Sequence, residues 1–516
     1  MNIHYHVNNL IEYAKTHLRL RADDLFFAKN AVMNLLDLHC DTAGEDEQPD
    51  TAKVTVAEIP DEFVKPLSDY AIEKGLVEES DRGLFETAIL GAVTPIPSQV
   101  NDYFRADTER YGSRQAVLNL YDLGIKSNYI KLSDVRRNIY WRYKGKKCDL
   151  EITINLSKPE KDNKEIARLR SAPQTGYPKC MLCEENVGYK GRVGFPARQT
   201  LRFVPIVLNG EEWNMQYSPY MYYDEHCIIF SKKHCPMVLN RTTFVKLLQF
   251  TEQFPFYMAG SNACLPIVGG SILTHEHYQG GGHFMPVHFT DVRWTFTHEK
   301  FPKLKFTVQE WYNSDIRIWG DDLNEVADGA EYIREIWNDY SDESVGILAR
   351  TTDSHNAITP IARKIDDTYT MDLLLRNNRT DETYPDGIFH AHPEYHNIKK
   401  EGIGLIEAMG LFILPGRLDK ECGAIKKILC GEKVDYLNPD DMLYKHKNMI
   451  EELVSKNGTN MTSDTADKVI KDYIGEVCEN ILLNTAVFKD TVDGHNAFLR
   501  FMEKAGFKKV GKLYEM

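Results

Sequence analysis

The sequence has no stretch of eighteen or more apolar residues, so a membrane-spanning helix is not expected. A signal peptide is also absent from the first twenty residues, because polar residues interrupt each apolar run and no small-residue cleavage site follows. Ten cysteines in a chain of this kind indicate reduced thiols. We therefore expect a cytoplasmic protein that does not contact a membrane.

Basic residues are in the minority, with 62 Lys and Arg against 76 Asp and Glu, which gives a formal net charge of -14. A nucleic-acid-binding protein needs a basic surface for its phosphate contacts, so the composition argues against that class. The composition does not exclude a ligand the size of a nucleotide, because a few local Arg, Lys or backbone N–H groups can bind one.

Common nucleotide and zinc motifs are missing as well. The chain has no G-x-x-x-x-G-K-[ST] loop, and Gly402-Ile-Gly404 lacks the third glycine of a dinucleotide-binding loop. The metalloprotease pattern H-E-x-x-H fails because Gln279 stands where the second histidine belongs. We expect no requirement for ATP or NAD.

The apolar pattern divides the chain into helical and strand-rich regions. Helical spacing dominates the first hundred residues, with Asp23 or Asp24 as a cap, and returns in the last eighty, with Ser463 or Asp464 as a cap. Short apolar segments between turns fill residues 177–286 and 293–379, with one helix starting at 243–250, and residues 148–156 alternate like a strand. We expect an α+β fold with four regions: helical 1–165, a core at 166–290, a second strand-rich half at 291–430, and helical 431–516.

The richest chemistry lies between Leu265 and His283. If the chain is extended here, His275, His277 and Gln279 share one face. A neutral imidazole can attack an α-phosphorus, and a neighbouring amide can hydrogen-bond the phosphoryl oxygens. Glycines flank the segment and let backbone N–H groups approach a phosphate closely; they are Gly269, Gly270, Gly280, Gly281 and Gly282.

Structural histidines in a glycine-rich turn are the alternative interpretation of this segment. Two histidines and a glutamine at a spacing of two, among five glycines, disfavour it. A water activated by a metal would need a carboxylate ligand on the same face, and none is evident there.

Cys180-Met-Leu-Cys183 is a candidate for zinc or redox chemistry. The residues that follow do not resemble the helix start of a thioredoxin-like redox unit. His234 and His275 could complete a tetrahedral Cys2His2 zinc site. Two ordinary buried thiols remain the simpler alternative.

Three further histidine groups have no assigned role. They are His283, His355 in Asp353-Ser-His-Asn, and the pair His390 and His392. For the last two groups, a solvated or structurally bonded imidazole is the simpler interpretation.

The segment from Pro266 to Gly281, PIVGGSILTHEHYQGG, resembles the signature of the type 2 galactose-1-phosphate uridylyltransferases. Cys264, just before it, departs from that signature, which has an acidic residue there. The resemblance extends over essentially the whole chain and includes YPKCMLCEENVGY from Tyr177, QYSPY from Gln216, ITPIAR from Ile358 and GIGLIEAMG from Gly402.

This family belongs to the histidine-triad superfamily, so the resemblance implies an antiparallel half-barrel core with flanking helices. By position, His277 corresponds to the nucleophile that becomes uridylylated and Gln279 to the amide that stabilises the phosphoryl group. Ser271 corresponds to a serine that hydrogen-bonds phosphate, and Asn186 is expected near the nucleotide.

The resemblance also implies structural zinc. Its ligands, carried over from the first type of the enzyme, would be Cys180, Cys183, His234 and His275. Four protein ligands leave no open position on the metal, so such a site would support the fold rather than activate water.

The implied function is a UDP-glucose–hexose-1-phosphate uridylyltransferase of galactose metabolism, the Leloir pathway. It would exchange UMP between UDP-glucose and galactose 1-phosphate by a ping-pong mechanism, and a homodimer fits the family. The alternatives are another histidine-triad nucleotide hydrolase or phosphorylase, a metal-dependent hydrolase, and a catalytically idle sugar-nucleotide-binding protein. The extent of the resemblance and the intact H-x-H-x-Q motif favour uridylyl transfer, whereas the motif does not define the preferred hexose 1-phosphate.

Overall fold

The computed structural model describes residues 2–38, 47–157, 176–270 and 272–510. The chain forms two compact units. The first comprises Met1–Arg137 and Lys161–Cys235, and the second comprises Asn138–Glu160 and Pro236–Met516. The division into four regions drawn from the sequence stays a prediction.

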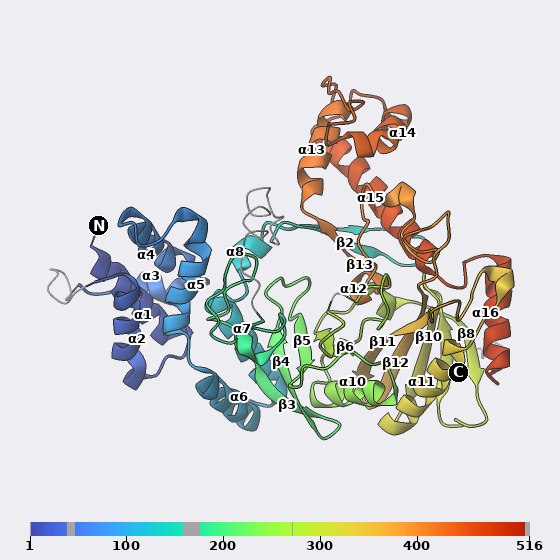
Figure 1. Ribbon diagram of the computed structural model, residues 1–516, viewed down its shortest axis with the longest axis horizontal. Coiled ribbons are helices and arrows are strands. Elements are labelled where there is room, and N and C mark those ends of the chain that lie inside the picture. Colours follow the sequence, from blue (N-terminus) through green and yellow to red (C-terminus); the bar gives the residue numbers. More distant parts are fainter. Residues whose placement is uncertain (1, 39–46, 158–175, 271, 511–516) are drawn as a thin grey trace. The chain divides into compact units, whose positions relative to one another are not determined.

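The first unit begins with helices (Figure 1). Val7, Leu10 and Ala14 of the first helix are fully buried at helical spacing, as an amphipathic helix requires. The prediction for the first hundred residues is confirmed, and Asp24 is the N-cap residue of α2. The helical elements are α1 (Ile3–His17), η1 (Ala22–Asp24), α2 (Leu25–Leu35), α3 (Thr51–Val56), α4 (Asp61–Glu73), η2 (Glu79–Asp81), α5 (Arg82–Val93), α6 (Pro97–Tyr111), α7 (Ser113–Lys126) and α8 (Leu132–Val135).

The break between α5 and α6 is stabilised by a buried cation. Pro97 starts α6, a position where proline's missing N–H costs no helical hydrogen bond. The Arg202 guanidinium donates to the carbonyl oxygens of Pro95 (2.6 Å) and Thr94 (3.2 Å). Burial lowers the pKa of Arg202 to about 10. These backbone contacts compensate a charge that would otherwise be costly to bury.

The first unit ends in an antiparallel meander of β3 (Val204–Leu208), β4 (Glu211–Tyr217) and β5 (Cys227–Ser231). Buried and exposed residues alternate along β3, so this strand has one face in the core. The short 3-10 helix η3 (Glu184–Asn186) follows the cysteine pair. The strands predicted around 203–208 and 227–230 are confirmed.

The second unit contains an antiparallel sheet whose strands run in the order β14-β8-β9-β10-β12-β11-β6-β7. The long neighbours β11 and β12 pair from Asn356↔Asn377 to Ile365↔Thr368, which confirms a strand near 369–375. The alternation predicted there is not observed, because every residue of β12 after Thr368 is buried. The strands are β6 (Met258–Gly260), β7 (His277–Gly281), β8 (Val292–Thr297), β9 (Lys305–Gln309), β10 (Asp315–Gly320), β11 (Asn356–Ile365), β12 (Thr368–Asn377) and β14 (Lys508–Val510).

Helices α10 (Arg241–Gln253) and α11 (Leu323–Asn338) pack on this sheet against β11 (Figure 1). The helix predicted to start at 243–250 is therefore confirmed, and Asn240 caps it with its side chain. Trp337 of α11 is fully buried, and its indole N–H donates to the carbonyl oxygen of Ala357 (2.9 Å). Short 3-10 and helical segments connect the strands: η4 (Pro286–Phe289), η5 (Glu343–Val345), η6 (Pro393–Tyr395) and α12 (Leu405–Ala408).

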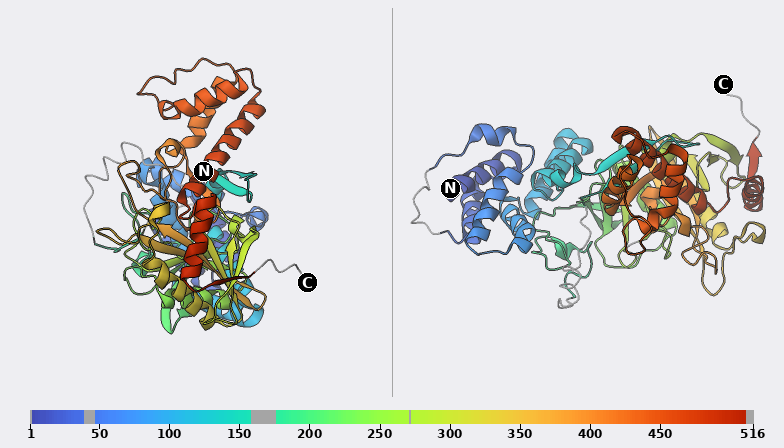
Figure 2. Two further views of the ribbon diagram at one scale, coloured as in Figure 1. Left: turned by 90° about the vertical axis from the view of Figure 1, so that its right-hand side faces the viewer. Right: turned by 90° about the horizontal axis from the view of Figure 1, so that it is seen from above.

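A smaller sheet in the same unit has the order β1-β2-β13, with β1 (Ile139–Tyr143), β2 (Leu150–Asn155) and β13 (Leu411–Pro415). Strands β1 and β2 are antiparallel, whereas β13 is parallel to β2. The remaining helical elements are α13 (Arg417–Leu429), η7 (Tyr444–His446), α14 (Lys447–Asn457), α15 (Ser463–Thr485) and α16 (Val492–Lys504), and Figure 2 shows α16 at the edge where β14 joins β8.

The long helix α15 corrects one detail of the prediction. Its N-cap residue is Thr462, whose side chain accepts from the backbone N–H of Thr465, rather than Ser463 or Asp464. Ile470, Ile474 and Ile481 are buried along one face, as their spacing predicts.

A buried carboxylate ties α13 to η7. Glu421 accepts from Arg417 (2.6 Å), Lys445 (2.5 Å) and His446 (2.9 Å). Burial alone would raise the pKa of Glu421, but the hydrogen bonds from His446 and Lys445 and the charge of Arg417 outweigh it and lower the pKa to about 2. A folded-state pKa below the unfolded value means that the ionised carboxylate stabilises the fold.

We therefore expect Glu421→Gln to be less stable than the parent chain at pH 7. The difference in unfolding free energy should shrink as the pH falls from about 4.5 towards 2, because in that window the unfolded parent chain binds a proton at Glu421 while the folded chain keeps the carboxylate ionised. Urea unfolding at several pH values measures it. A difference that stays constant down to pH 2 would show that Glu421 acts only through packing.

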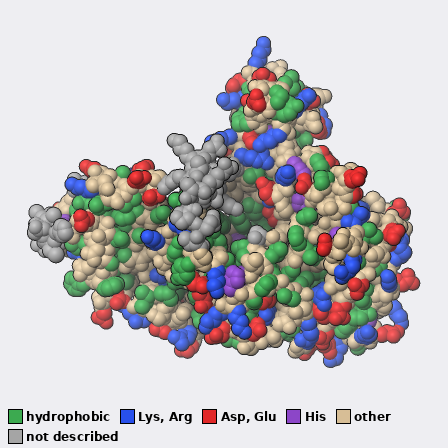
Figure 3. Space-filling model, in the orientation of Figure 1, with side chains coloured by type: hydrophobic (Ala, Val, Ile, Leu, Met, Phe, Trp, Pro, Cys, Tyr) green, Lys and Arg blue, Asp and Glu red, His purple; other side chains and the backbone are tan. Residues whose placement is uncertain are grey.

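The described residues form a mixed α+β fold, as predicted, and only the pair of β2 and β13 in the smaller sheet departs from antiparallel pairing. Within the part of the chain that the structure describes, no helix combines the length and apolar character needed to cross a membrane. Lys and Arg side chains are interspersed with Asp and Glu side chains over the face shown in Figure 3.

Candidate active site and metal centre

Strand β7 begins at His277, and its register with β6 pairs Gln279 with Gly260. The alternation predicted for this segment is visible on the opposite face, where the Tyr278 hydroxyl donates to Glu276 (2.8 Å) and Lys246 contacts the same carboxylate (3.3 Å). His277 and Gln279 are two residues apart in one strand and therefore share the other face.

The hydrogen bond of His277 defines the chemistry of its imidazole. Nδ1 lies 2.8 Å from the backbone carbonyl oxygen of His275. A carbonyl oxygen can only accept, so in the neutral ring the proton is on Nδ1 and the lone pair is on Nε2. This tautomer has its nucleophilic nitrogen at the far end of the ring from the backbone.

Burial also keeps this imidazole neutral. His277 is only 6% exposed. Desolvation lowers its pKa below 6.5, an effect that the hydrogen bond to the His275 carbonyl opposes. A neutral ring is the form that can attack phosphorus.

The glycine turn that precedes β7 lies against a second glycine turn. Gly269 has a φ of +107°, and a Cβ there would lie 2.3 Å from Cα of Gly404 and 2.8 Å from the carbonyl oxygen of Ile403. Arg376 donates to that carbonyl (2.7 Å), and Asn262 accepts from the backbone N–H that follows Gly404 (2.9 Å). The close approach therefore requires glycine at 269.

We expect Gly269→Ala to lower the unfolding free energy by about 2 kcal/mol more than Gly458→Ala. Gly458 is the matched control, because it also has a positive φ (+73°) but a Cβ there would have nothing within 4 Å. The control measures the backbone cost alone, about 1–3 kcal/mol, because Gly458 has φ +73° and ψ −165°, a conformation essentially limited to glycine. Denaturant unfolding of both variants measures the difference. Equal losses would show that the second turn moves aside at no cost.

The sulfur atoms of Cys180 and Cys183 and a ring nitrogen of His234 lie at distances typical of metal ligands. Sγ of Cys180 and Cys183 are 3.4 Å apart, and Cys183 Sγ lies 3.1 Å from Nδ1 of His234. Ligand atoms around tetrahedral zinc are roughly 3.4–3.8 Å apart, given the zinc bond lengths. All three side chains belong to the first unit.

The protonation chemistry agrees with this spacing. Burial, followed by the contact with Cys180, raises the pKa of Cys183 to about 12. Two adjacent thiolates therefore need a cation to form near neutral pH. Two thiolates and an imidazole suit zinc, and the described residues thus contain a possible Cys/His metal-binding cluster.

Asn186 supports the cysteine turn directly. Its side-chain N–H groups donate to the carbonyl oxygens of Cys180 and Cys183, both at 2.8 Å. Asn186 is fully buried, and within the described chain its Oδ1 makes no hydrogen bond. The sequence argument had placed Asn186 only near the nucleotide. Ser271 lies outside the described residues.

The four histidines to which the sequence assigned no role all lie in the second unit. His283 contacts Glu151 (2.7 Å), His355 contacts Asn378 (2.9 Å), and His392 stacks on Tyr384 with a centroid distance of 4.0 Å. All three rings have local partners, which agrees with the simpler interpretation of His355 and His392; for His283 the sequence made no prediction.

His390 differs from them. It is 3% exposed, and within the described chain neither ring nitrogen makes a hydrogen bond. Burial, together with the charge of Arg376, lowers the pKa of His390 to about 4.

Sequence reasoning missed the supports of the glycine turn, Asn262 and Arg376. Gly402 and Gly404 offered a signal, because paired glycines allow a second backbone to approach closely. In the sequence they were considered as an incomplete dinucleotide motif and as part of the family resemblance, not as the partner of another turn.

Comparisons with known proteins show which family the chain belongs to. Residues 43–236 match the sequence model for the N-terminal domain of galactose-1-phosphate uridyl transferase, and residues 250–447 match that for its C-terminal domain. The chain belongs to the galactose-1-phosphate uridyl transferase family. The two matched ranges contain both the cysteine motif and the H-x-H-x-Q segment.

Similarity to individual members of the family covers nearly the full length. The galactose-1-phosphate uridylyltransferase of Caldanaerobacter subterraneus subsp. tengcongensis is 44% identical over 519 residues, covering 98% of each chain. That of Fusobacterium nucleatum is 42% identical (97% of this chain, 98% of the relative), and that of Bacillus subtilis is 40% identical (99% and 100%). No solved structure matches the chain significantly.

Proposed function

We propose that this protein is a UDP-glucose–hexose-1-phosphate uridylyltransferase that works through a covalent intermediate on His277. The observation that carries the proposal is the Nδ1 hydrogen bond of His277, which leaves the lone pair on Nε2, in a chain that belongs to the galactose-1-phosphate uridyl transferase family.

In the first half-reaction, Nε2 of His277 attacks the α-phosphorus of UDP-glucose. A P–N bond forms while the bond from the α-phosphorus to the bridging oxygen breaks, and glucose 1-phosphate leaves with that electron pair. The Nδ1–H of His277 donates to the His275 carbonyl oxygen and thereby stabilises the positive charge that develops on the ring.

In the second half-reaction, galactose 1-phosphate enters and its phosphate oxygen attacks the same phosphorus. The P–N bond breaks, its electron pair returns to Nε2, and UDP-galactose leaves. The energy of the phosphoryl bond is retained on the enzyme, so the exchange needs neither ATP nor NAD.

Residues around the nucleophile hold the phosphates. Gln279 shares the face of His277 and donates its amide N–H to the phosphoryl oxygens in the intermediate. The turn of Gly269 and Gly270 offers backbone N–H groups, and the Ser271 hydroxyl adds a further donor. Asn186 lies near the nucleotide in addition to its contacts with the cysteine turn.

Zinc is the cofactor we propose for the cluster of Cys180, Cys183, His234 and His275. When bound, it supplies structural cross-linking and no reactive water, since all four positions belong to the protein. The ligand His275 would thereby fix the backbone whose carbonyl oxygen orients His277.

The finer features of the family complete the proposal. We infer a histidine-triad half-barrel around β7, a catalytic core within residues 166–290, a cytoplasmic location and a homodimer. The small-molecule partners are UDP-glucose, UDP-galactose and hexose 1-phosphates.

Isotope exchange tests the proposed function. The enzyme is incubated with UDP-glucose and labelled glucose 1-phosphate, without galactose 1-phosphate. A ping-pong uridylyltransferase moves label into UDP-glucose, because the first half-reaction is reversible by itself. A hydrolase or a mere binding protein gives no labelled UDP-glucose, and that result would reject the proposal.

A further inference from the structure

A cavity of about 310 Å³ lies in the second unit, and none of its lining residues belongs to the proposed catalytic set. One wall consists of Arg142 in β1 and the residues that precede and begin β2, and the other is η4, which follows β7 along the chain. The volume is at the lower end of the range for small-molecule sites, about 300–1,000 Å³. The lining residues are Arg142, Cys148, Asp149, Glu151, Pro286 and Phe289.

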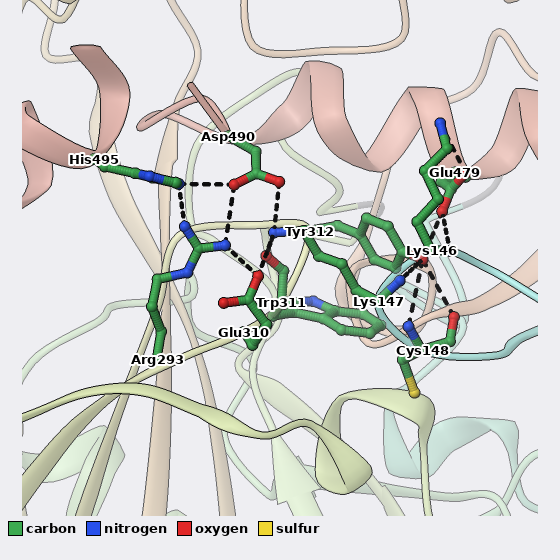
Figure 4. A network of polar contacts seen from close by, with 10 residues as sticks. All are labelled: Lys146, Lys147, Cys148, Arg293, Glu310, Trp311, Tyr312, Glu479, Asp490 and His495. Carbon is green, nitrogen blue, oxygen red and sulfur yellow. Dashed lines mark hydrogen bonds and ion pairs between the residues drawn. The ribbon is translucent and has the colours of Figure 1, made fainter. Parts of the chain in front are cut away.

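The β2 wall is held in place by a network of polar contacts (Figure 4). The Tyr312 hydroxyl lies 3.2 Å from the carbonyl oxygen of Cys148 and 2.7 Å from the buried carboxylate of Glu479. Next to Cys148, Lys147 forms ion pairs with Asp490 (2.9 Å) and Glu310 (3.1 Å). The wall is therefore anchored before any ligand arrives, which lowers the entropic cost of binding.

The polar groups of the cavity suit hydroxyls better than phosphate. The Glu151 side chain is only 7% exposed and contacts both His283 (2.7 Å) and Arg142 (3.3 Å), while Asp149 is exposed. One guanidinium against two carboxylates gives no excess positive charge for a phosphate. Carboxylate oxygens accept hydrogen bonds from hydroxyl groups, and guanidinium N–H groups donate hydrogen bonds to hydroxyl oxygens.

An exposed aromatic ring completes the cavity. Phe289 is 67% exposed, and its ring centroid lies 6.1 Å from that of Phe284, which is 52% exposed. The guanidinium of Arg363 packs on Phe284 at 3.8 Å and fixes it. Exposed aromatic rings offer a flat apolar surface to the C–H face of a ligand.

We propose that this cavity binds the pyranose ring of a sugar. The hydroxyls of the ring contact Asp149, Glu151 and Arg142, and one C–H face packs against Phe289. The ring belongs either to a free hexose or to the hexosyl part of a sugar phosphate whose phosphate stays outside the cavity. The second source rests on the proposed function, and the first does not.

Saturation-transfer NMR on the full chain tests this site, with D-galactose and galactose 1-phosphate as separate probes. We expect Phe289→Ala to raise the dissociation constant about tenfold and Asp149→Asn severalfold. Both residues are exposed, so the variants should fold normally. Phe26→Ala and Glu299→Gln are matched controls, because Phe26 is 81% exposed and the Glu299 side chain is 80% exposed away from the cavity.

Weaker binding of both probes in the two cavity variants assigns the site to free hexoses. Weaker binding of galactose 1-phosphate alone assigns it to the hexosyl part of the substrate. Equal affinities in all variants, or no saturable binding of either probe to the parent chain, would overturn the proposal. Isotope exchange by the parent chain is measured separately, so failure of the proposed function is recognised independently.

Discussion

Replacing His277 with alanine should lower the rate of uridylyl exchange by at least about a thousandfold. The substitution removes the nitrogen that forms the P–N bond, and no other group on this face can take its place at the same position. The isotope-exchange rate between UDP-glucose and labelled glucose 1-phosphate measures this loss directly, because the exchange requires only the first half-reaction.

Thr274→Ala is the matched control for this experiment. Thr274 is exposed and lies in the same segment, three residues before the nucleophile, so its substitution tests local disturbance alone. We expect the control to keep its exchange rate within a few fold and both variants to retain the unfolding midpoint of the parent chain. Exchange at the parent rate in His277→Ala would remove His277 from the nucleophile role.

The second large effect is expected at the cysteine cluster. Metal analysis of the parent chain should find about one zinc per chain, and Cys183→Ser should lose it. The variant should also unfold at a temperature roughly 10 °C lower, because the cross-link between the cysteine turn and His234 is lost. Calorimetry and elemental analysis on the same sample give both results.

Cys430→Ser is the control for the loss of a thiol, because Cys430 is exposed and lies outside the cluster. It should retain both the zinc and the thermal midpoint. A parent chain that is stable and active without zinc would contradict the metal assignment. That result would leave the proposed covalent mechanism of His277 unaffected, because the mechanism does not require zinc.

The local parts of the site could be predicted from the sequence. A spacing of two placed His277 and Gln279 on one face, because alternation is a property of a single extended strand. The C-x-x-C spacing likewise brought Cys180 and Cys183 together within one turn. The same is true of the helices: α1 and α15 could be predicted because their helical periodicity depends only on their own residues.

Contacts between distant segments could not be predicted in this way. The close packing around Gly269 depends on Gly404 and Arg376, which are more than a hundred residues away. No pattern in the local sequence predicts this contact. The cavity joins Glu151 to Phe289 for the same reason. Strand order is equally non-local, so β14 beside β8 was not foreseen.

Some side chains also have roles that residue type does not reveal. Asn186 was expected near a nucleotide, but both of its side-chain N–H groups hold the cysteine turn. Thr462 is preferred over its neighbours as the α15 cap because its hydroxyl reaches the N–H of Thr465. Such choices depend on backbone geometry that several polar residues in a row could satisfy.

The most direct test of the account is intact-mass spectrometry of the protein after incubation with UDP-glucose alone. We predict a single uridylyl adduct on the parent chain, formed in step with released glucose 1-phosphate, and none on His277→Ala. The tautomer held by the His275 carbonyl oxygen requires the adduct to be on Nε2 of His277. A parent chain that shows no adduct, while UDP-glucose stays intact or is only hydrolysed, would contradict the covalent mechanism.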